Sequence, residues 1–259
     1  MIFVEEARLH QEKSAQLRRA AGLCGLLGAL LFFAGDMLFY GYFGAGSDFA
    51  AKMLEVPLRA PQIRLFVGGL IGPLAACLCI LGFWHVRMNV RPSSRISGNV
   101  MFAAFFALMV SGSAVHTLWT AKRLAMKYCS GQIGPCSDLL AAVKSYWTQA
   151  YNIGAIPGYL GALILIVLVL FGRTRYSRWT VVANPALLIL FSTLAAHMPA
   201  PFGSILVGGF TNLSIAVFFL VSVLSTWRDP SGIDTEDDVF RLRRLNRTPE
   251  SIVGHRKEP

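Results

Sequence analysis

Five ionisable side chains interrupt the long apolar stretches of this sequence. They are Asp36, Arg64, His85, His116 and His197. An ionisable group in apolar surroundings is costly, so each of them is a candidate for binding or chemistry. Spacing adds aromatic neighbours, because residues three or four apart share one face of a helix. Tyr40 follows Asp36 by four positions, and Trp119 follows His116 by three.

Three interpretations of these residues are open. In the first, they are structural: Asp36 pairs with Arg64, and histidine and asparagine side chains join helices by hydrogen bonds. In the second, which we favour as a function, they line a cavity that binds or transports a small solute or a lipid headgroup. Arg64 would take an anionic group, and Asp36 a cation or a proton. The residues assigned to this cavity are Asp36, Tyr40, Arg64, His116, Trp119, Asn152, His197 and Asn212.

The third interpretation is a membrane-embedded hydrolase that processes lipids. Asp36, His116 and His197 would supply one carboxylate and two imidazoles, a set that can hold Zn²⁺ and leave a position open for water. The three residues are far apart in the chain, unlike the ligands of a His-Glu-x-x-His motif. Haem between His116 and His197 is a weaker alternative, since nothing else marks a haem pocket. The sequence therefore does not establish a cofactor.

The elements that must position these residues are six apolar stretches, each near the ~20 residues that a helix needs to cross a bilayer. Helices are expected because unpaired backbone groups in hydrocarbon are costly. The predicted fold class is an all-α, polytopic membrane bundle at residues 20–228, with a helical N-terminal extension (1–19) and a basic tail (229–259). The predicted spans are residues 20–43, 63–86, 98–121, 145–171, 179–198 and 202–227.

Composition supports the membrane class. The chain is 54% hydrophobic and only 15% charged, whereas soluble domains carry about a quarter charged residues. Its formal charge of +10 lies in loops and tails, not in a basic patch on a soluble fold, which argues against nucleic acid as a partner. The expected partners are the bilayer and its anionic inner-leaflet lipids. The expected location is a cell membrane, namely a bacterial inner membrane, and the sequence does not predict an oligomeric state.

The distribution of basic residues predicts the orientation. Most of the 24 Lys and Arg residues fall in the N-terminal region, in the loops near Arg91 and Arg175, and in the C-terminal tail. The positive-inside rule therefore places both termini in the cytoplasm. The loop between the third and fourth spans is an exception, because it is basic but would lie outside.

This orientation brings the candidate residues to one depth. Asp36, Arg64, His116 and His197 all fall in a slab on the order of 10 Å below the outer surface. We therefore predict that they approach one another, the first three closely, in a polar cavity that opens outward. His85 lies at the inner side and is interpreted as an interfacial anchor.

Two cysteines lie in the loop between the third and fourth spans. Cys129 and Cys136 are separated by a segment with Gly131, Gly134 and Pro135, which allow the loop to fold back. Because the loop is predicted to lie outside the cytoplasm, we expect a disulfide between them. The alternative is two free thiols.

A short run within the first span resembles a known motif. Gly35-Asp36-x-Leu38 is similar to a motif of the lysoplasmalogenase-like membrane family, whose members have more spans. The chain as a whole resembles uncharacterised bacterial six-span inner-membrane families. The first resemblance covers a handful of residues, and no activity follows from either.

Overall fold

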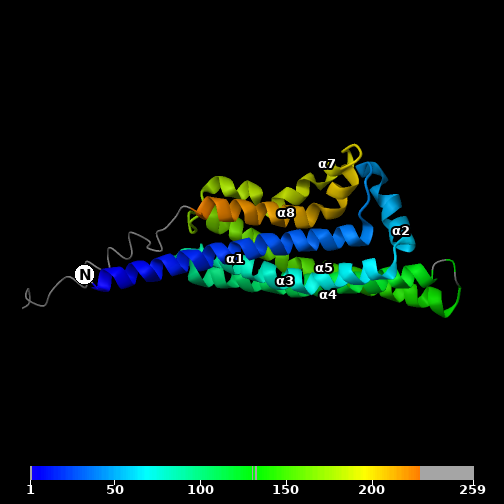
Figure 1. Ribbon diagram of the computed structural model, residues 1–259, viewed down its shortest axis with the longest axis horizontal. Helices are drawn as coiled ribbons and strands as arrows, with labels where there is room; N and C mark the ends of the chain where they lie inside the picture. The colour runs from blue at the N-terminus through cyan, green and yellow to red at the C-terminus, as the bar shows by residue number, and fades with distance from the viewer. Residues whose placement is uncertain (1, 130, 132, 228–259) are drawn as a thin grey trace, which may run out of the picture. The chain divides into compact units, whose positions relative to one another are not determined.

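The computed structural model describes residues 2–129, 131 and 133–227, and in these residues every regular element is helical (Figure 1). The chain divides into two units. One unit, Leu17–Arg228, contains the helical bundle. The other unit consists of Met1–Gln16 and Asp229–Pro259, and the part of it that the structure describes is the start of α1. The predicted basic tail lies outside the described residues. The elements are α1 (Ile2–Tyr40), η1 (Gly46–Asp48), α2 (Phe49–Arg59), α3 (Gln62–Met88), η2 (Pro92–Ser94), α4 (Arg95–Cys129), α5 (Pro135–Leu170), η3 (Arg178–Ala183), α6 (Pro185–Leu188), η4 (Ile189–Phe191), α7 (Ser192–Ala196) and α8 (Gly203–Thr226).

Five helices in the described part of the chain are long and apolar enough to cross a membrane. They correspond to the first four predicted spans and the sixth. The all-α class is confirmed, and the five helices agree with a multi-pass membrane protein. The number of six spans and the side of the membrane on which the termini lie stay predictions. The stretches that qualify are Glu12–Tyr40, Gln62–Met88, Pro92–Cys129, Pro135–Leu170 and Gly203–Thr226.

The segment predicted as the fifth span, residues 179–198, is not one continuous helix. It consists of the short pieces η3, α6, η4 and α7. The break between η3 and α6 falls at Asn184-Pro185, because Pro185 has no N–H to donate to a preceding turn. The Asn184 side chain starts a new helix there by accepting a hydrogen bond from the Ala186 N–H at 3.0 Å. Hydropathy averaged over the segment does not detect such a break.

These four pieces nevertheless pack along α8. Tyr176, just before them, is hydrogen-bonded to Ser222 near the C-terminal end of α8, at 2.7 Å between the hydroxyl oxygens. Met198, just after them, accepts a hydrogen bond from Gly46 N at 2.9 Å, and the N–H of Ser204 at the start of α8 donates to Gly44 O at 3.1 Å. The segment thus runs beside α8 from one end to the other, in the opposite direction.

The helices meet closely in the middle of the bundle. Phe83 of α3 stacks on Phe105 of α4, with ring centroids 4.1 Å apart, and packs against Phe219 of α8 at 5.0 Å. Helices α1 and α3 touch through two glycines, since a Cβ added to Gly25 would lie 2.5 Å from the Cα of Gly82. Small residues at this crossing allow the backbones to approach.

Helix α2 follows the C-terminal end of α1, and we call this the α2 end of the bundle. Phe49 at the start of α2 packs edge-on against Tyr40, with ring centroids 5.6 Å apart. On the exposed side of α2, Glu55 forms salt bridges with Lys52 at 2.7 Å and with Arg59 at 2.8 Å. The hydrogen bond from Lys52 and the nearby Arg59 charge lower the pKa of Glu55.

The tip between α4 and α5 also lies at the α2 end, because Lys127 Nζ donates to Ala60 O at 2.6 Å. There Cys129, the last residue of α4, forms a disulfide with Cys136 in the first turn of α5, with Cα atoms 5.2 Å apart. The predicted disulfide is therefore present in the structure. It joins the ends of two antiparallel helices.

Candidate functional site

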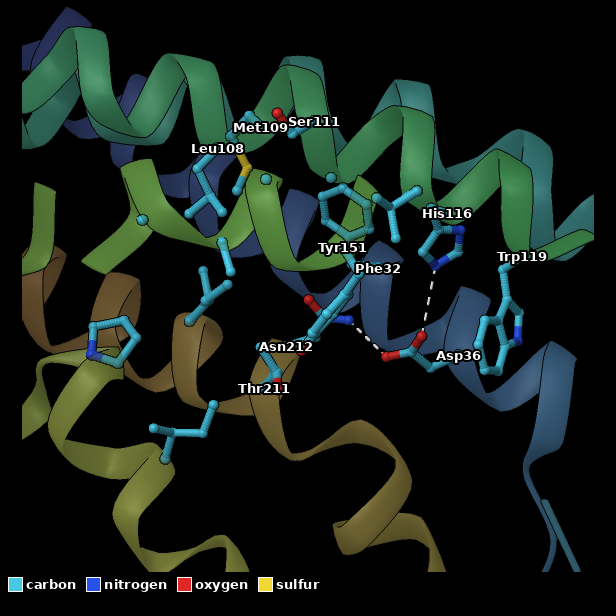
Figure 2. A pocket seen from close by; sticks show the side chains of 18 of the residues that line it. Phe32, Asp36, Leu108, Met109, Ser111, His116, Trp119, Tyr151, Thr211 and Asn212 are labelled. Carbon is cyan, nitrogen blue, oxygen red and sulfur yellow. Dashed lines mark hydrogen bonds and ion pairs between the residues drawn. The ribbon is translucent and has the colours of Figure 1, made fainter. Parts of the chain in front are cut away.

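A cavity of about 420 Å³ lies toward the α2 end, and its lining comes from α1, α2, α3, α4, α5, α6, η4 and α8. Most of the lining side chains are aliphatic or aromatic. The polar ones include Asp36, Ser111, His116, Thr211 and Asn212. Figure 2 shows these five at the cavity, with the carboxylate of Asp36 between His116 and Asn212.

Asp36 is the centre of the polar group. Its Oδ2 accepts a hydrogen bond from Asn212 Nδ2 at 2.6 Å, and its Oδ1 lies 3.6 Å from His116 Nε2 (Figure 2). The side chains of Asp36 and His116 are 13% and 9% exposed, so both are largely removed from solvent. Neither imidazole nitrogen of His116 has a hydrogen-bond partner among the described residues. Three helices, α1, α4 and α8, thus converge on one carboxylate.

Two glycines make the slot that His116 occupies. A Cβ added to Gly35, next to Asp36 on α1, would lie 2.6 Å from His116 Cε1. A Cβ added to Gly72 on α3 would lie 2.8 Å from His116 Cβ. Phe32 and Phe39 pack on the ring from α1, with centroids 5.3 and 5.1 Å away. The position of the imidazole is therefore set by packing on several sides.

Aromatic side chains and two cations lie beyond Asp36, toward the α2 end. Trp119 of α4 packs against Trp147 of α5, with centroids 4.5 Å apart. Lys122 Nζ lies 3.7 Å from the centroid of Trp147, and Arg123 Cζ lies 4.1 Å from that of Trp119. Such placements are attractive because the faces of aromatic rings carry partial negative charge.

Arg123 is almost completely buried, at 1% exposure. One guanidinium nitrogen contacts Met126 Sδ at 3.4 Å, but Nε and Nη2 have no hydrogen-bond partner in the described part of the chain. The third span is predicted from the sequence to end at residue 121, which would place Arg123 in a loop. Helix α4 instead continues to Cys129 and carries Arg123 into the protein.

In the described part of the chain, Arg64 forms no hydrogen bond or ion pair with Asp36. Its Nε donates to Leu38 O at 2.6 Å, and its Nη2 donates to Met37 O at 2.9 Å and Gly41 O at 3.0 Å. These are the carbonyl groups at the end of α1, where a cation also interacts favourably with the helix dipole. The role of Arg64 in this structure is to cap α1.

The other predicted site residues divide into two groups. Tyr40, Trp119 and Asn212 line the cavity, as Asp36 and His116 do, and the Tyr40 hydroxyl donates to Gly208 O at 2.9 Å. Asn152 and His197 are exposed and do not line it. Because His197 lies apart, the proposed zinc set of Asp36, His116 and His197 is not assembled, nor is the alternative haem pair. No cluster of three His, Cys, Asp or Glu side chains suited to a metal occurs among the residues described.

A second polar cluster lies at the opposite end of the bundle. His85 is 1% exposed, so its interpretation as an interfacial anchor is wrong. Its Nδ1 is 2.8 Å from Arg18 O, and its Nε2 is 3.0 Å from Ser222 Oγ. Asn89 Nδ2 donates to His85 O at 3.0 Å and to the Tyr176 hydroxyl at 3.2 Å. Burial raises the pKa of Tyr176 to about 12.

The fold and the cavity define a class: a multi-pass helical protein with a largely apolar pocket inside its bundle. The model of a family of unknown function (DUF6796) matches residues 13–228, so the chain belongs to that family. This agrees with the expected membership of an uncharacterised family. No curated protein and no solved structure matches the chain.

Proposed function

We propose that this protein binds a small, mostly apolar molecule within the membrane, as the binding step of transport or sensing. The observation that carries the proposal is the 420 Å³ cavity with apolar walls and one polar centre at Asp36, His116 and Asn212. Ligand sites are typically concave and mostly apolar, about 300–1,000 Å³ in volume, with a few convergent polar groups that orient the ligand. The cavity has each of these properties.

We further propose that the α2 end faces outward and that the chain crosses the membrane six times. The segment from η3 to α7 would be the fifth crossing, and its path along the whole of α8 supports this. Both termini would then be cytoplasmic, in agreement with the distribution of Lys and Arg. The Cys129–Cys136 disulfide would lie outside, where disulfides persist. The basic inner side would contact anionic lipids of a bacterial inner membrane.

A variant that fills the cavity tests the proposed function. Gly112 lines the cavity, and a Cβ added there would meet no atom within 4 Å. Gly112→Leu should therefore occupy the cavity without disturbing α4. Ala114→Leu is the matched control, because Ala114 is an exposed residue of the same helix that does not line the cavity.

The measurement is the quenching of tryptophan fluorescence by dibromobiphenyl, a neutral apolar probe, with the protein in lipid nanodiscs. Trp119 and Trp147 line the cavity, so a bound probe contacts them directly. We expect saturable quenching in the wild type and in Ala114→Leu, and at least roughly tenfold weaker binding in Gly112→Leu. Quenching that never saturates, or that is equal in the two variants, would refute the proposed function.

A further inference from the structure

The charges on the cavity wall constrain what the cavity can bind. Asp36 is the only carboxylate that lines it, and neither Lys nor Arg contributes to the described lining. The one described lining residue that can carry a positive charge is His116, and it does so only when protonated. With a neutral imidazole, the cavity therefore presents one negative charge in apolar surroundings.

The carboxylate of Asp36 retains acceptor capacity. Two carboxylate oxygens offer about four lone-pair positions, and Asn212 donates a hydrogen bond to one of the Asp36 oxygens. His116 Nε2, at 3.6 Å, is beyond a good hydrogen bond. The Tyr40 hydroxyl donates to Gly208 O and also lies close enough to interact with the Asp36 carboxylate, so lone-pair positions remain even with both neighbours counted. A buried carboxylate in this state gains from a further donor or from a positive charge.

Aromatic rings line the same cavity. Phe32, Phe39 and Tyr151 contribute to its wall together with Asp36, and Figure 2 shows Phe32 and Tyr151 among the lining side chains. Ring faces attract cations, most strongly where water is excluded. Lys122 and Arg123, in contrast, lie against the tryptophans and do not line the cavity.

We infer that the ligand class of this cavity is a lipophilic monocation: an apolar, mostly aromatic or aliphatic body with one ammonium or other onium group that lies against Asp36. This inference rests on the proposed function, and it adds the chemical class of the ligand that the cavity binds. The apolar walls would take the body of the molecule, and the carboxylate with the aromatic rings of the wall would take the charge. An anion of the same size would meet the carboxylate unfavourably.

Two ions of nearly identical shape and opposite charge test this inference. Tetraphenylphosphonium and tetraphenylborate are each titrated into wild-type protein in nanodiscs, with empty nanodiscs as the blank for partition into lipid. We expect the phosphonium ion to displace dibromobiphenyl from the cavity and the borate ion to fail to do so. Equal displacement by the two ions, or displacement by the borate ion alone, would overturn the assignment of a cation.

Asp36→Asn supplies the second test, because it removes the charge and keeps the shape. Asp48→Asn is the control, since Asp48 is an exposed residue of η1 outside the cavity. We expect Asp36→Asn to weaken phosphonium binding at least tenfold more than it weakens dibromobiphenyl binding, and a tenfold difference corresponds to 1.4 kcal/mol. Asp48→Asn should change neither.

The outcomes separate the two proposals. Failure of dibromobiphenyl to bind the wild type refutes the proposed function itself. Binding of dibromobiphenyl with phosphonium binding that is unchanged in Asp36→Asn refutes the ligand class alone. Loss of both probes in Asp36→Asn also refutes it, because the carboxylate would then shape the cavity rather than bind the ligand's charge.

Discussion

Two histidines with similar apolar neighbours in the sequence have opposite surroundings in the structure. His197 is exposed after α7, whereas His85 is buried and bonded through both ring nitrogens, to Arg18 O and Ser222 Oγ. The latter arrangement joins α1, α3 and α8 at the end of the bundle away from the cavity. In a low-dielectric environment, the loss of one member of such a network leaves its partners unsatisfied.

We therefore predict that His85→Leu lowers the free energy of unfolding by about 1–3 kcal/mol, the usual cost of a buried polar group left without its partner. His197→Leu should change it by less than about 0.5 kcal/mol, because exposed substitutions have small effects. Unfolding of the purified protein in mixed micelles with increasing dodecyl sulfate measures both values. Equal stability of the two variants would show that the His85 network contributes nothing to the fold.

At the scale of the helices, glycine serves two different purposes. Between α1 and α3 it allows contact, since Gly25 and Gly82 leave no space for a Cβ on either helix. On α4, Gly112 borders open space in the cavity. All three glycines lie within long helices, where glycine by itself is unfavourable relative to alanine. Only the packing tells the two cases apart.

The same substitution should consequently have opposite effects at these positions. Gly82→Ala is expected to destabilise the protein by about 1–3 kcal/mol, because α1 and the ring of Phe219 must move away from the new methyl group. Gly112→Ala should be neutral or stabilising by about 0.5–1 kcal/mol. The same unfolding assay compares them. If Gly82→Ala were as stable as Gly112→Ala, the close crossing of α1 and α3 would be wrong.

For the whole molecule, the path of the segment from η3 to α7 decides on which side of the membrane the C-terminus lies. If the η3 to α7 segment crosses, α8 ends on the side where α1 begins. The chain termini then share the cytoplasm, and the α4–α5 tip with its disulfide lies outside. If the segment does not cross, the five long helices place the termini on opposite sides.

Cysteine labelling in intact cells distinguishes the two paths. In a background with Cys24, Cys77 and Cys79 replaced by alanine, we expect a membrane-impermeant maleimide to label Asp138→Cys from outside. It should label Ser93→Cys only after permeabilisation; both positions are exposed. A green fluorescent protein fused to the C-terminus should fluoresce, because it folds in the cytoplasm. A dark fusion with the same labelling pattern would mean five crossings.

Much of this architecture follows from the sequence alone. Long apolar runs specify helices through the cost of unpaired backbone groups in lipid, and their lengths place five of the six predicted spans on helices that qualify as spans. The glycine- and proline-containing loop between Cys129 and Cys136, together with its predicted location outside the cytoplasm, was enough to predict the disulfide. The shared depth of Asp36 and His116 was enough to expect their contact, which the structure contains.

Tertiary structure alone decided the rest, because hydropathy reports the average polarity of a segment and not its rotation, its breaks or its neighbours. It turned Arg64 toward the carbonyls that end α1, left His197 outside the cavity, and enclosed His85. It also extended α4 far enough to bury Arg123. The residues able to do chemistry are thus visible in the sequence, but the packing of the helices selects which of them meet.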